Sequence, residues 1–221
     1  MELPVYVSVV FILNTLLTLF FLFKAAKGAK VFIVVIALWI IFQGIVASTG
    51  FYTVFDTKPP HFIFLLFPPL IGIILLFITA RGRAFIDTLD TKWLTYLHVV
   101  RVPVELVLYW LFVANYVPEL MTFEGRNLDI LSGLTAPFIA FFLYSGKLNS
   151  KVALFWNFAC LALLFNIVIN AVLSAPSPFQ QQAFEQPNVG VFYFPFVWLP
   201  CFIVPAVLLS HVVCIRQIIK K

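Results

Sequence analysis

The sequence predicts an all-α integral membrane protein with seven transmembrane helices, its N-terminus outside the cell and its C-terminus in the cytoplasm. Three observations lead to this prediction. The 221 residues are 63% hydrophobic and only 10% charged, whereas soluble domains are roughly half apolar and about one-quarter charged. Apolar segments that approach the length of a bilayer crossing recur along the chain. Lysine and arginine concentrate in alternate connections between those segments.

Seven apolar segments come close to the roughly 20 residues that a helical crossing needs. The first follows Met1-Glu2 with no basic region before it, so a retained helix is expected rather than a cleaved signal peptide. The fifth is the shortest, but the charge pattern requires it. Together the segments predict a single membrane domain over residues 1–221. They are Pro4–Phe23, Val31–Phe55, Phe62–Ala80, Leu94–Val117, Ile130–Gly146, Val152–Leu173 and Phe192–Ile215.

The basic residues orient these spans. Of the fourteen lysines and arginines, Lys58 and Arg126 lie on one side and Arg101 lies within a span. All the others lie in the connections of the opposite side, which is therefore predicted to be cytoplasmic. They are Lys24, Lys27, Lys30, Arg81, Arg83, Lys92, Lys147, Lys151, Arg216, Lys220 and Lys221.

The charge distribution and the loops also indicate the surroundings of the chain. The positive charge is dispersed over short connections rather than gathered in a patch, so no nucleic-acid partner is expected. The lipid bilayer is the expected environment. Compact loops and the absence of a glycosylation sequon suit a multi-pass protein of the bacterial inner membrane.

Spans one to three and five to seven are compatible with a diverged parallel repeat around span four. Each half has a basic turn, a span with a central amide (Gln43; Asn166), and a proline-bearing span that ends in arginine (Arg81; Arg216). This three-one-three layout is similar to that of small sugar transporters and PQ-loop proteins, although the chain contains no Pro-Gln dipeptide. Any two sets of membrane helices look alike at this level, so chance similarity stays open beside a true repeat.

Span four carries the candidate site, which is a polar stripe of His98, Arg101, Glu105 and Tyr109. Spacings of three, four and four place these side chains within an arc of about 80° on one helix face. Ionisable groups at membrane depth are costly, and they mark functional sites by default. Arg101 and Glu105 are expected to meet as a proton-responsive pair, because residues four apart are neighbours on a helix. The alternative is an ion pair that fixes helix packing.

Other polar residues are expected to complete the site. The amides Gln43 of span two and Asn166 and Asn170 of span six are candidate partners for the stripe and candidate solute ligands. Each amide alone is more often an interhelical hydrogen bond than a ligand. Pro103 removes the hydrogen bond to the Val99 carbonyl, so a bend is expected beside the stripe.

His98 and His211 lie at similar depth on spans four and seven. Two histidines on different helices could ligate a b-type haem or a metal, with Arg101 near a haem propionate. Their alternative role is an ordinary hydrogen bond to a neighbour. Span seven has no lysine that could hold retinal, and the chain lacks HExxH, GxSxG, GxGD and P-loop motifs.

These observations favour a small membrane transporter or permease that moves an unidentified solute or ion along a polar pathway on span four. Proton coupling is compatible with the Arg101 and Glu105 pair. Enzymatic activity and a cofactor are not expected under this hypothesis. A haem- or metal-binding redox protein or enzyme is the second hypothesis. A receptor or an assembly subunit of a membrane complex is the third. A homo-oligomer or a membrane-protein partner is compatible with all three.

Overall fold

The computed structural model describes residues 1–220, which are 72% helical and contain no strand, so the prediction of an all-α fold is confirmed. The α-helices are joined by 3-10 turns, and one π-helical turn lies near the C-terminal end. In chain order the elements are α1 (Val5–Ala25), α2 (Lys30–Ser48), η1 (Phe51–Thr53), α3 (Ile63–Ile78), α4 (Ala80–Thr88), α5 (Thr91–Leu97), η2 (His98–Val100), α6 (Arg101–Val113), η3 (Glu119–Met121), α7 (Ile130–Tyr144), α8 (Ser150–Leu173), η4 (Gly190–Phe192), η5 (Leu199–Ile203, the π-helical turn) and α9 (Val204–Ile219).

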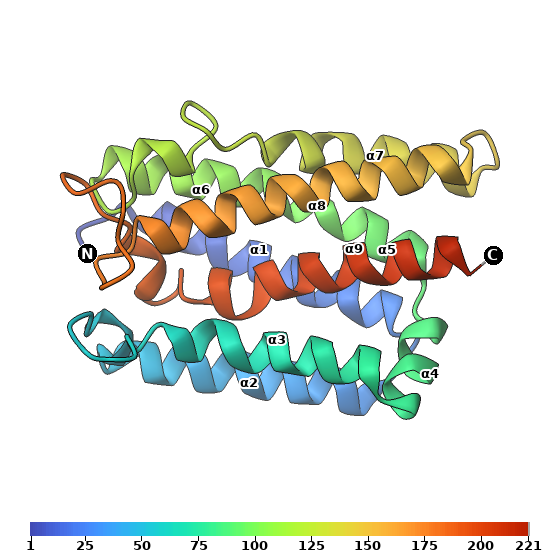
Figure 1. The fold of residues 1–221 in the computed structure, drawn as a ribbon, viewed down its shortest axis with the longest axis horizontal. Coiled ribbons are helices and arrows are strands. Elements are labelled where there is room, and N and C mark those ends of the chain that lie inside the picture. Colours follow the sequence, from blue (N-terminus) through green and yellow to red (C-terminus); the bar gives the residue numbers. More distant parts are fainter. Residues whose placement is uncertain (221) are drawn as a thin grey trace.

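The helices run side by side along the longest axis of the molecule, with the N-terminus and the end of α9 at opposite ends (Figure 1). The central helix pair is α5 and α9, which contact each other and also contact α7 and α8, respectively. Helix α1 packs against α5 and α6. The hairpin of α2 and α3 flanks this group and reaches it through contacts with α1, η5 and α9 (Figure 1).

Within residues 1–220, five helical segments are long and apolar enough to cross a membrane. Two of these segments consist of several shorter elements that follow one another without a break. Thr91–Val113 contains α5, η2 and α6, and Leu199–Ile219 contains η5 and α9. A sixth segment results if α3 and α4, which meet at an angle of 93°, count as one. Helix α7 is apolar but has only 15 residues. The chain is therefore membrane-embedded in character, with several helices able to span a bilayer.

Several ends differ from the predicted spans because of local backbone chemistry. Helix α2 ends at Ser48 rather than at residue 55, because Gly50 adopts a φ of +77° that a helix cannot continue through. The last helical run begins at Leu199 rather than at residue 192, and Pro200 lies in its first turn, where the missing N–H breaks no helical hydrogen bond. The predicted fourth span is interrupted by η2.

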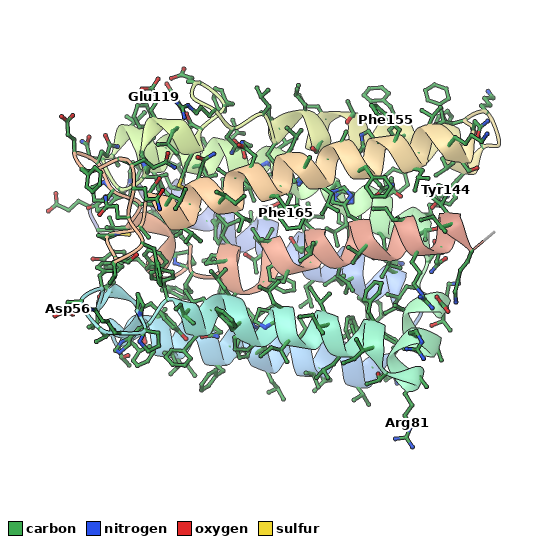
Figure 2. The ribbon with its side chains drawn as sticks, in the orientation of Figure 1. Asp56, Arg81, Glu119, Tyr144, Phe155 and Phe165 are labelled. Carbon is green, nitrogen blue, oxygen red and sulfur yellow. The ribbon has the colours of Figure 1, made fainter. Side chains whose placement is uncertain are left out.

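The outer surface of the bundle is apolar and its two ends are polar (Figure 2). Phe155 and Phe165 point outward from α8, with exposed fractions of 75% and 50%. Asp56 and Glu119 lie at the end of the bundle that carries the N-terminus, and Arg81 lies at the opposite end. This distribution is the one that a bilayer requires, since charged groups avoid its hydrocarbon region.

A network of ion pairs fastens α4 to α9 at the basic end of the bundle, outside the spanning helices. Asp87 accepts from Arg216 Nε at 2.8 Å and from Lys220 Nζ at 2.5 Å. Hydrogen bonds from Arg216 and Lys220 lower the pKa of Asp87 to about 2. The network therefore persists across neutral and mildly acidic pH. Lys221, which was counted with the basic residues of this side, lies outside the described residues.

Candidate functional site

The polar stripe of span four lies at a break in its helix. The 3-10 turn His98–Val100 separates α5 from α6, as expected one turn before Pro103, whose ring nitrogen cannot donate to the Val99 carbonyl. Asn14 of α1 donates from Nδ2 to the Val100 carbonyl at 3.0 Å. This bond satisfies a carbonyl at the break and ties α1 to the site.

Arg101 is buried near the middle of the run from Thr91 to Val113, and it pairs with Asp129 rather than with Glu105. Arg101 Nε lies 2.9 Å from Asp129 Oδ2, and the two side chains are 2% and 8% exposed. Asp129 immediately precedes α7. Its contact with Arg101 shows that α7 begins at about the mid-depth of the bundle rather than at its outer end.

The short α7 follows from this deep start. Fifteen residues span about 22 Å, whereas the hydrocarbon core of a bilayer is about 30 Å thick. The remaining depth is covered by residues 126–129, a non-helical stretch that we call the approach segment, in which Asn127 and Asp129 are buried. Irregular backbone at membrane depth is tolerated only where protein buries it or where it lines a cavity. The approach segment therefore identifies the interior between α6 and α7 as a candidate site.

Asn127 of the approach segment links the two carboxylates. Its Nδ2 donates to Glu105 Oε1 at 2.5 Å and to the Met121 carbonyl at 3.0 Å. Its Oδ1 accepts from the backbone N–H of Asp129 at 3.0 Å. One oxygen of each acid, Glu105 Oε2 and Asp129 Oδ1, is buried without a hydrogen-bond partner.

The other side of Arg101 faces α8 and α9. Its two terminal nitrogens lie 3.4 Å from His211 Nε2 and 3.3 Å from the Cys160 carbonyl oxygen. His211 Nδ1 lies 2.9 Å from Asn157 Oδ1. Arg101 thus joins α6, α7, α8 and α9 in one buried polar cluster, which consists of His98, Arg101, Glu105, Asn127, Asp129, Asn157 and His211.

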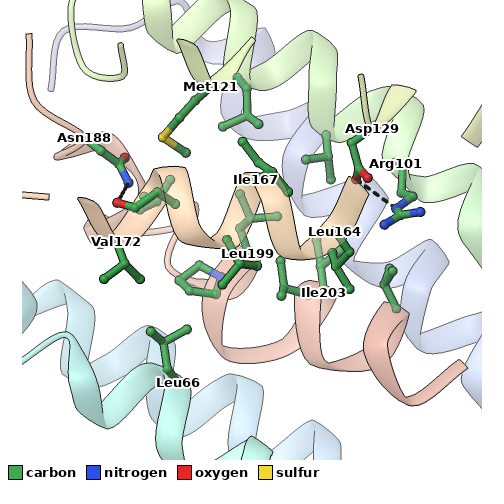
Figure 3. Close-up of a pocket in the computed structure, with 18 of the residues that line it drawn as sticks. Leu66, Arg101, Met121, Asp129, Leu164, Ile167, Val172, Asn188, Leu199 and Ile203 are labelled. Carbon is green, nitrogen blue, oxygen red and sulfur yellow. Dashed lines mark hydrogen bonds and ion pairs between the residues drawn. The ribbon is translucent and has the colours of Figure 1, made fainter. Parts of the chain in front are cut away.

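A mostly apolar cavity of about 80 Å³ adjoins this polar cluster. Arg101 and Asp129 lie at one end of it and Asn188 lies at the other, with Leu164, Ile167 and other apolar side chains between them (Figure 3). Glu105 also lines the cavity. The space therefore suits a molecule with an apolar body and one polar or charged end.

Gly133 permits the close packing that holds Asp129 against Arg101. A Cβ at Gly133 would lie 2.7 Å from Val102 Cγ2 and 3.0 Å from the Val102 backbone nitrogen. We expect Gly133→Ala to lower the free energy of unfolding by about 1–2 kcal/mol, because overpacking outweighs the gain of about 1 kcal/mol in helix propensity. Denaturant unfolding in detergent measures this change.

The matched control is Gly72→Ala, because a Cβ at Gly72 meets nothing within 4 Å. This substitution is expected to leave stability unchanged or to raise it. Equal effects of the two substitutions would show that the approach of α7 to α6 is not tight at Gly133.

The structure brings together only part of the predicted site. His98, Arg101 and Glu105 belong to the polar cluster, and His211 joins them. Tyr109 does not, because it lies just over two turns beyond Arg101 on α6 and stacks on Phe123, with ring centroids 5.2 Å apart. The expected ion pair of Arg101 with Glu105 is also absent within residues 1–220, because Asp129 takes the guanidinium and Asn127 takes the carboxylate.

The predicted amides lie elsewhere. Gln43 of α2 accepts a hydrogen bond from the Tyr52 hydroxyl within its own hairpin. Asn166 and Asn170 of α8 lie toward the outer loops, where Asn166 donates to the Arg126 carbonyl and Asn170 accepts from Gln182. These three amides stabilise loops rather than complete the cluster. Gln43 belongs to the α2–α3 hairpin, and Asn166 and Asn170 lie nearer the outer end of α8.

His98 and His211 are in contact, but their arrangement does not fit a haem iron or a metal. Their rings stack with centroids 3.9 Å apart and planes inclined by 22°. The nitrogen lone pairs lie in the ring planes, so those of stacked rings run nearly parallel and do not converge on one ion about 2 Å away. In the described part of the chain, no group of three or more His, Cys, Asp or Glu residues could hold a metal ion.

Sequence reasoning missed three residues of the cluster. Asn157 lies inside an apolar span, so its polarity was a usable signal. Asn127 and Asp129 had no such signal, because they belong to a polar stretch between two spans that is typical of an outer loop. Only the fold shows that this stretch turns into the bundle.

Comparison with known proteins assigns the chain to a family. No curated protein and no solved structure matches the chain. Residues 59–219 match the family described as a domain of unknown function, DUF8737. This range begins before α3 and contains every residue of the polar cluster. The chain belongs to the DUF8737 family.

Proposed function

We propose that this protein is a seven-span membrane transporter that exchanges a proton for a small solute with an apolar body and a cationic group. The proposed crossings are α1, α2, α3, α5 to α6, α7 with its approach segment, α8, and η5 to α9. The positive-inside pattern places the N-terminus outside and the basic end in the cytoplasm. Short loops without a sequon favour a bacterial inner membrane.

One observation supports transport above the other hypotheses. Two buried carboxylates and one buried guanidinium, Glu105, Asp129 and Arg101, lie together at the end of an apolar cavity. With all three ionised and the histidines neutral, this group carries two negative charges and one positive charge. A net charge buried at membrane depth is costly, so the group favours binding one further positive charge.

That positive charge is either a proton or the cationic part of a solute. The net charge of −1 on Glu105, Asp129 and Arg101 can be neutralised by only one of the two at a time. Glu105 Oε2 and Asp129 Oδ1 are the unpartnered oxygens that would receive it. Binding of the solute then requires release of the proton, which is the basis of exchange. The apolar walls formed by Leu164 and Ile167 would hold the body of the solute.

The test is proton movement in liposomes that contain the purified protein and an entrapped pH dye. Tetramethylammonium, added outside acid-loaded vesicles, is expected to accelerate proton efflux. Methanesulfonate is of similar size and has the opposite charge, so it is expected to have no effect, and protein-free liposomes should respond to neither. Equal rates with and without protein would reject exchange for this class of solute.

A further inference from the structure

A second, larger cavity lies on the far side of the bundle from the approach segment. Its volume is about 370 Å³, and it separates the α2–α3 hairpin from α1, η5 and α9. We call it the hairpin groove. The residues that line it are all apolar or nearly so: Leu22, Phe32, Val35, Ile36, Trp39, Pro68, Pro69, Gly72, Ile73, Leu76, Cys201, Phe202, Pro205, Ala206 and Leu209.

The hairpin groove opens toward the outer surface. Leu65 is the one buried residue of α3, and Val35 of α2 is 60% exposed. Gly72, in the middle of α3, has open space where a side chain would be. Because α2 and α3 are apolar helices at the flank of the bundle (Figure 1), the space between them and α9 faces the hydrocarbon region of the bilayer.

Basic residues follow or precede the segments that line the inner end of the hairpin groove. Lys27 and Lys30 lie in and after the turn that precedes Phe32, and Arg81 and Arg83 lie on α4, just beyond Leu76. Phe32 of α2 contacts Phe85 of α4, with ring centroids 5.0 Å apart, so α4 folds across this end. Lys30 and Arg83 are thereby brought to the same end of the groove, whereas Arg81 points away from the bundle (Figure 2).

These four cations have no acidic partner in the described part of the chain, where the ion pairs involve only Arg101, Arg216 and Lys220. Arg83 donates to the Phe77 and Ile78 carbonyls, which keeps its guanidinium at the end of α3. Lys24 differs, because its ammonium lies over the rings of Phe20 and Trp93 on the opposite side of α1.

We propose that the hairpin groove binds an anionic phospholipid of the inner leaflet. One acyl chain would lie along α3 past Gly72, and the phosphate would contact Lys30 and Arg83. Basic pockets between transmembrane helices on the cytoplasmic side recognise anionic headgroups in this way. The charge complementarity selects the headgroup, and the apolar lining selects a lipid over a free phosphate. This inference does not rest on the proposed transport activity.

Native mass spectrometry of the protein released from nanodiscs tests the proposal. In nanodiscs of equal phosphatidylglycerol and phosphatidylcholine, we expect one phosphatidylglycerol to stay bound to each protein. Gly72→Phe places a ring in the path proposed for the acyl chain and is expected to abolish this retention. Ile74→Phe adds the same ring to the same helix at a position that is 55% exposed and outside the groove, so it should retain the lipid.

The charge is tested separately. The double substitution Lys30→Gln/Arg83→Gln is expected to weaken phosphatidylglycerol binding about 30-fold (about 2 kcal/mol) while the groove stays intact. Lys147→Gln/Lys151→Gln is the matched control, because these lysines lie in the α7–α8 turn and the first turn of α8, at the same end of the bundle but away from α4 (Figure 1).

Three outcomes would overturn the proposal. They are equal retention of the two lipids by the unmodified protein, retention by Gly72→Phe equal to that of Ile74→Phe, and equal loss in the two charge variants. Inorganic phosphate that displaces the lipid at millimolar concentration would also contradict a site built for an acyl chain. Circular dichroism of each variant shows whether its helices remain folded.

Discussion

Glu105→Gln is expected to abolish solute-driven proton movement while the protein stays folded. Glutamine keeps the oxygen that accepts from Asn127 Nδ2, so the link to the approach segment is preserved. It cannot bind or release a proton, and it removes the net negative charge of the group formed by Glu105, Asp129 and Arg101. In the liposome assay with tetramethylammonium, the proton efflux rate should fall to that of protein-free vesicles.

The matched control is Glu124→Gln, which removes a carboxylate from the exposed part of the same connection. It should leave the proton efflux rate unchanged. Binding of the labelled cation should be lost together with proton movement, because Glu105→Gln leaves Asp129 and Arg101 with no net negative charge for the cation to neutralise. A Glu105→Gln protein that keeps full efflux would show that the proton is bound elsewhere, and one that fails to fold would show that Glu105 is structural.

Arg101→Met is expected to lower the free energy of unfolding by about 3–5 kcal/mol, which is the usual cost of removing one partner of a buried ion pair. Asp129 would then be buried without its cation, beside a second carboxylate. Thermal or denaturant unfolding in detergent measures the loss. Arg126→Met is the control, because Arg126 is exposed, and surface substitutions usually change stability by less than about 0.5 kcal/mol.

The double substitution Arg101→Met/Asp129→Leu should recover most of the stability lost in the single variant. Replacing both members of a buried ion pair by apolar residues of similar volume is often neutral or stabilising. The stability losses of Arg101→Met and Asp129→Leu are measured separately for comparison. If they simply add in the double variant, direct pairing is contradicted, since independent sites show no interaction energy. Recovered stability without recovered proton movement would assign the pair to the site rather than to the fold.

The sequence by itself determined the class of this protein and the place of its most costly residues. Apolar length and the low fraction of charged residues predict membrane helices from composition alone, because a bilayer imposes the same requirement along every helix. Arg101 and Glu105 could be singled out for the same reason, since charge inside an apolar span is visible without a fold. Pro103 likewise predicted the interruption now seen at His98–Val100.

The partners of those residues were decided by tertiary structure. A helical spacing of four places Arg101 near Glu105, but it cannot show that a neighbouring helix supplies a better-placed carboxylate. Asp129 reaches Arg101 because α7 is short and its approach segment turns into the bundle, with Gly133 allowing close contact. Asn166 is likewise not a partner of Arg101 or Glu105, because it lies near the outer end of α8 and donates to the Arg126 carbonyl. Local pattern shows which side chains are costly to bury, whereas the packing of distant segments decides what compensates them.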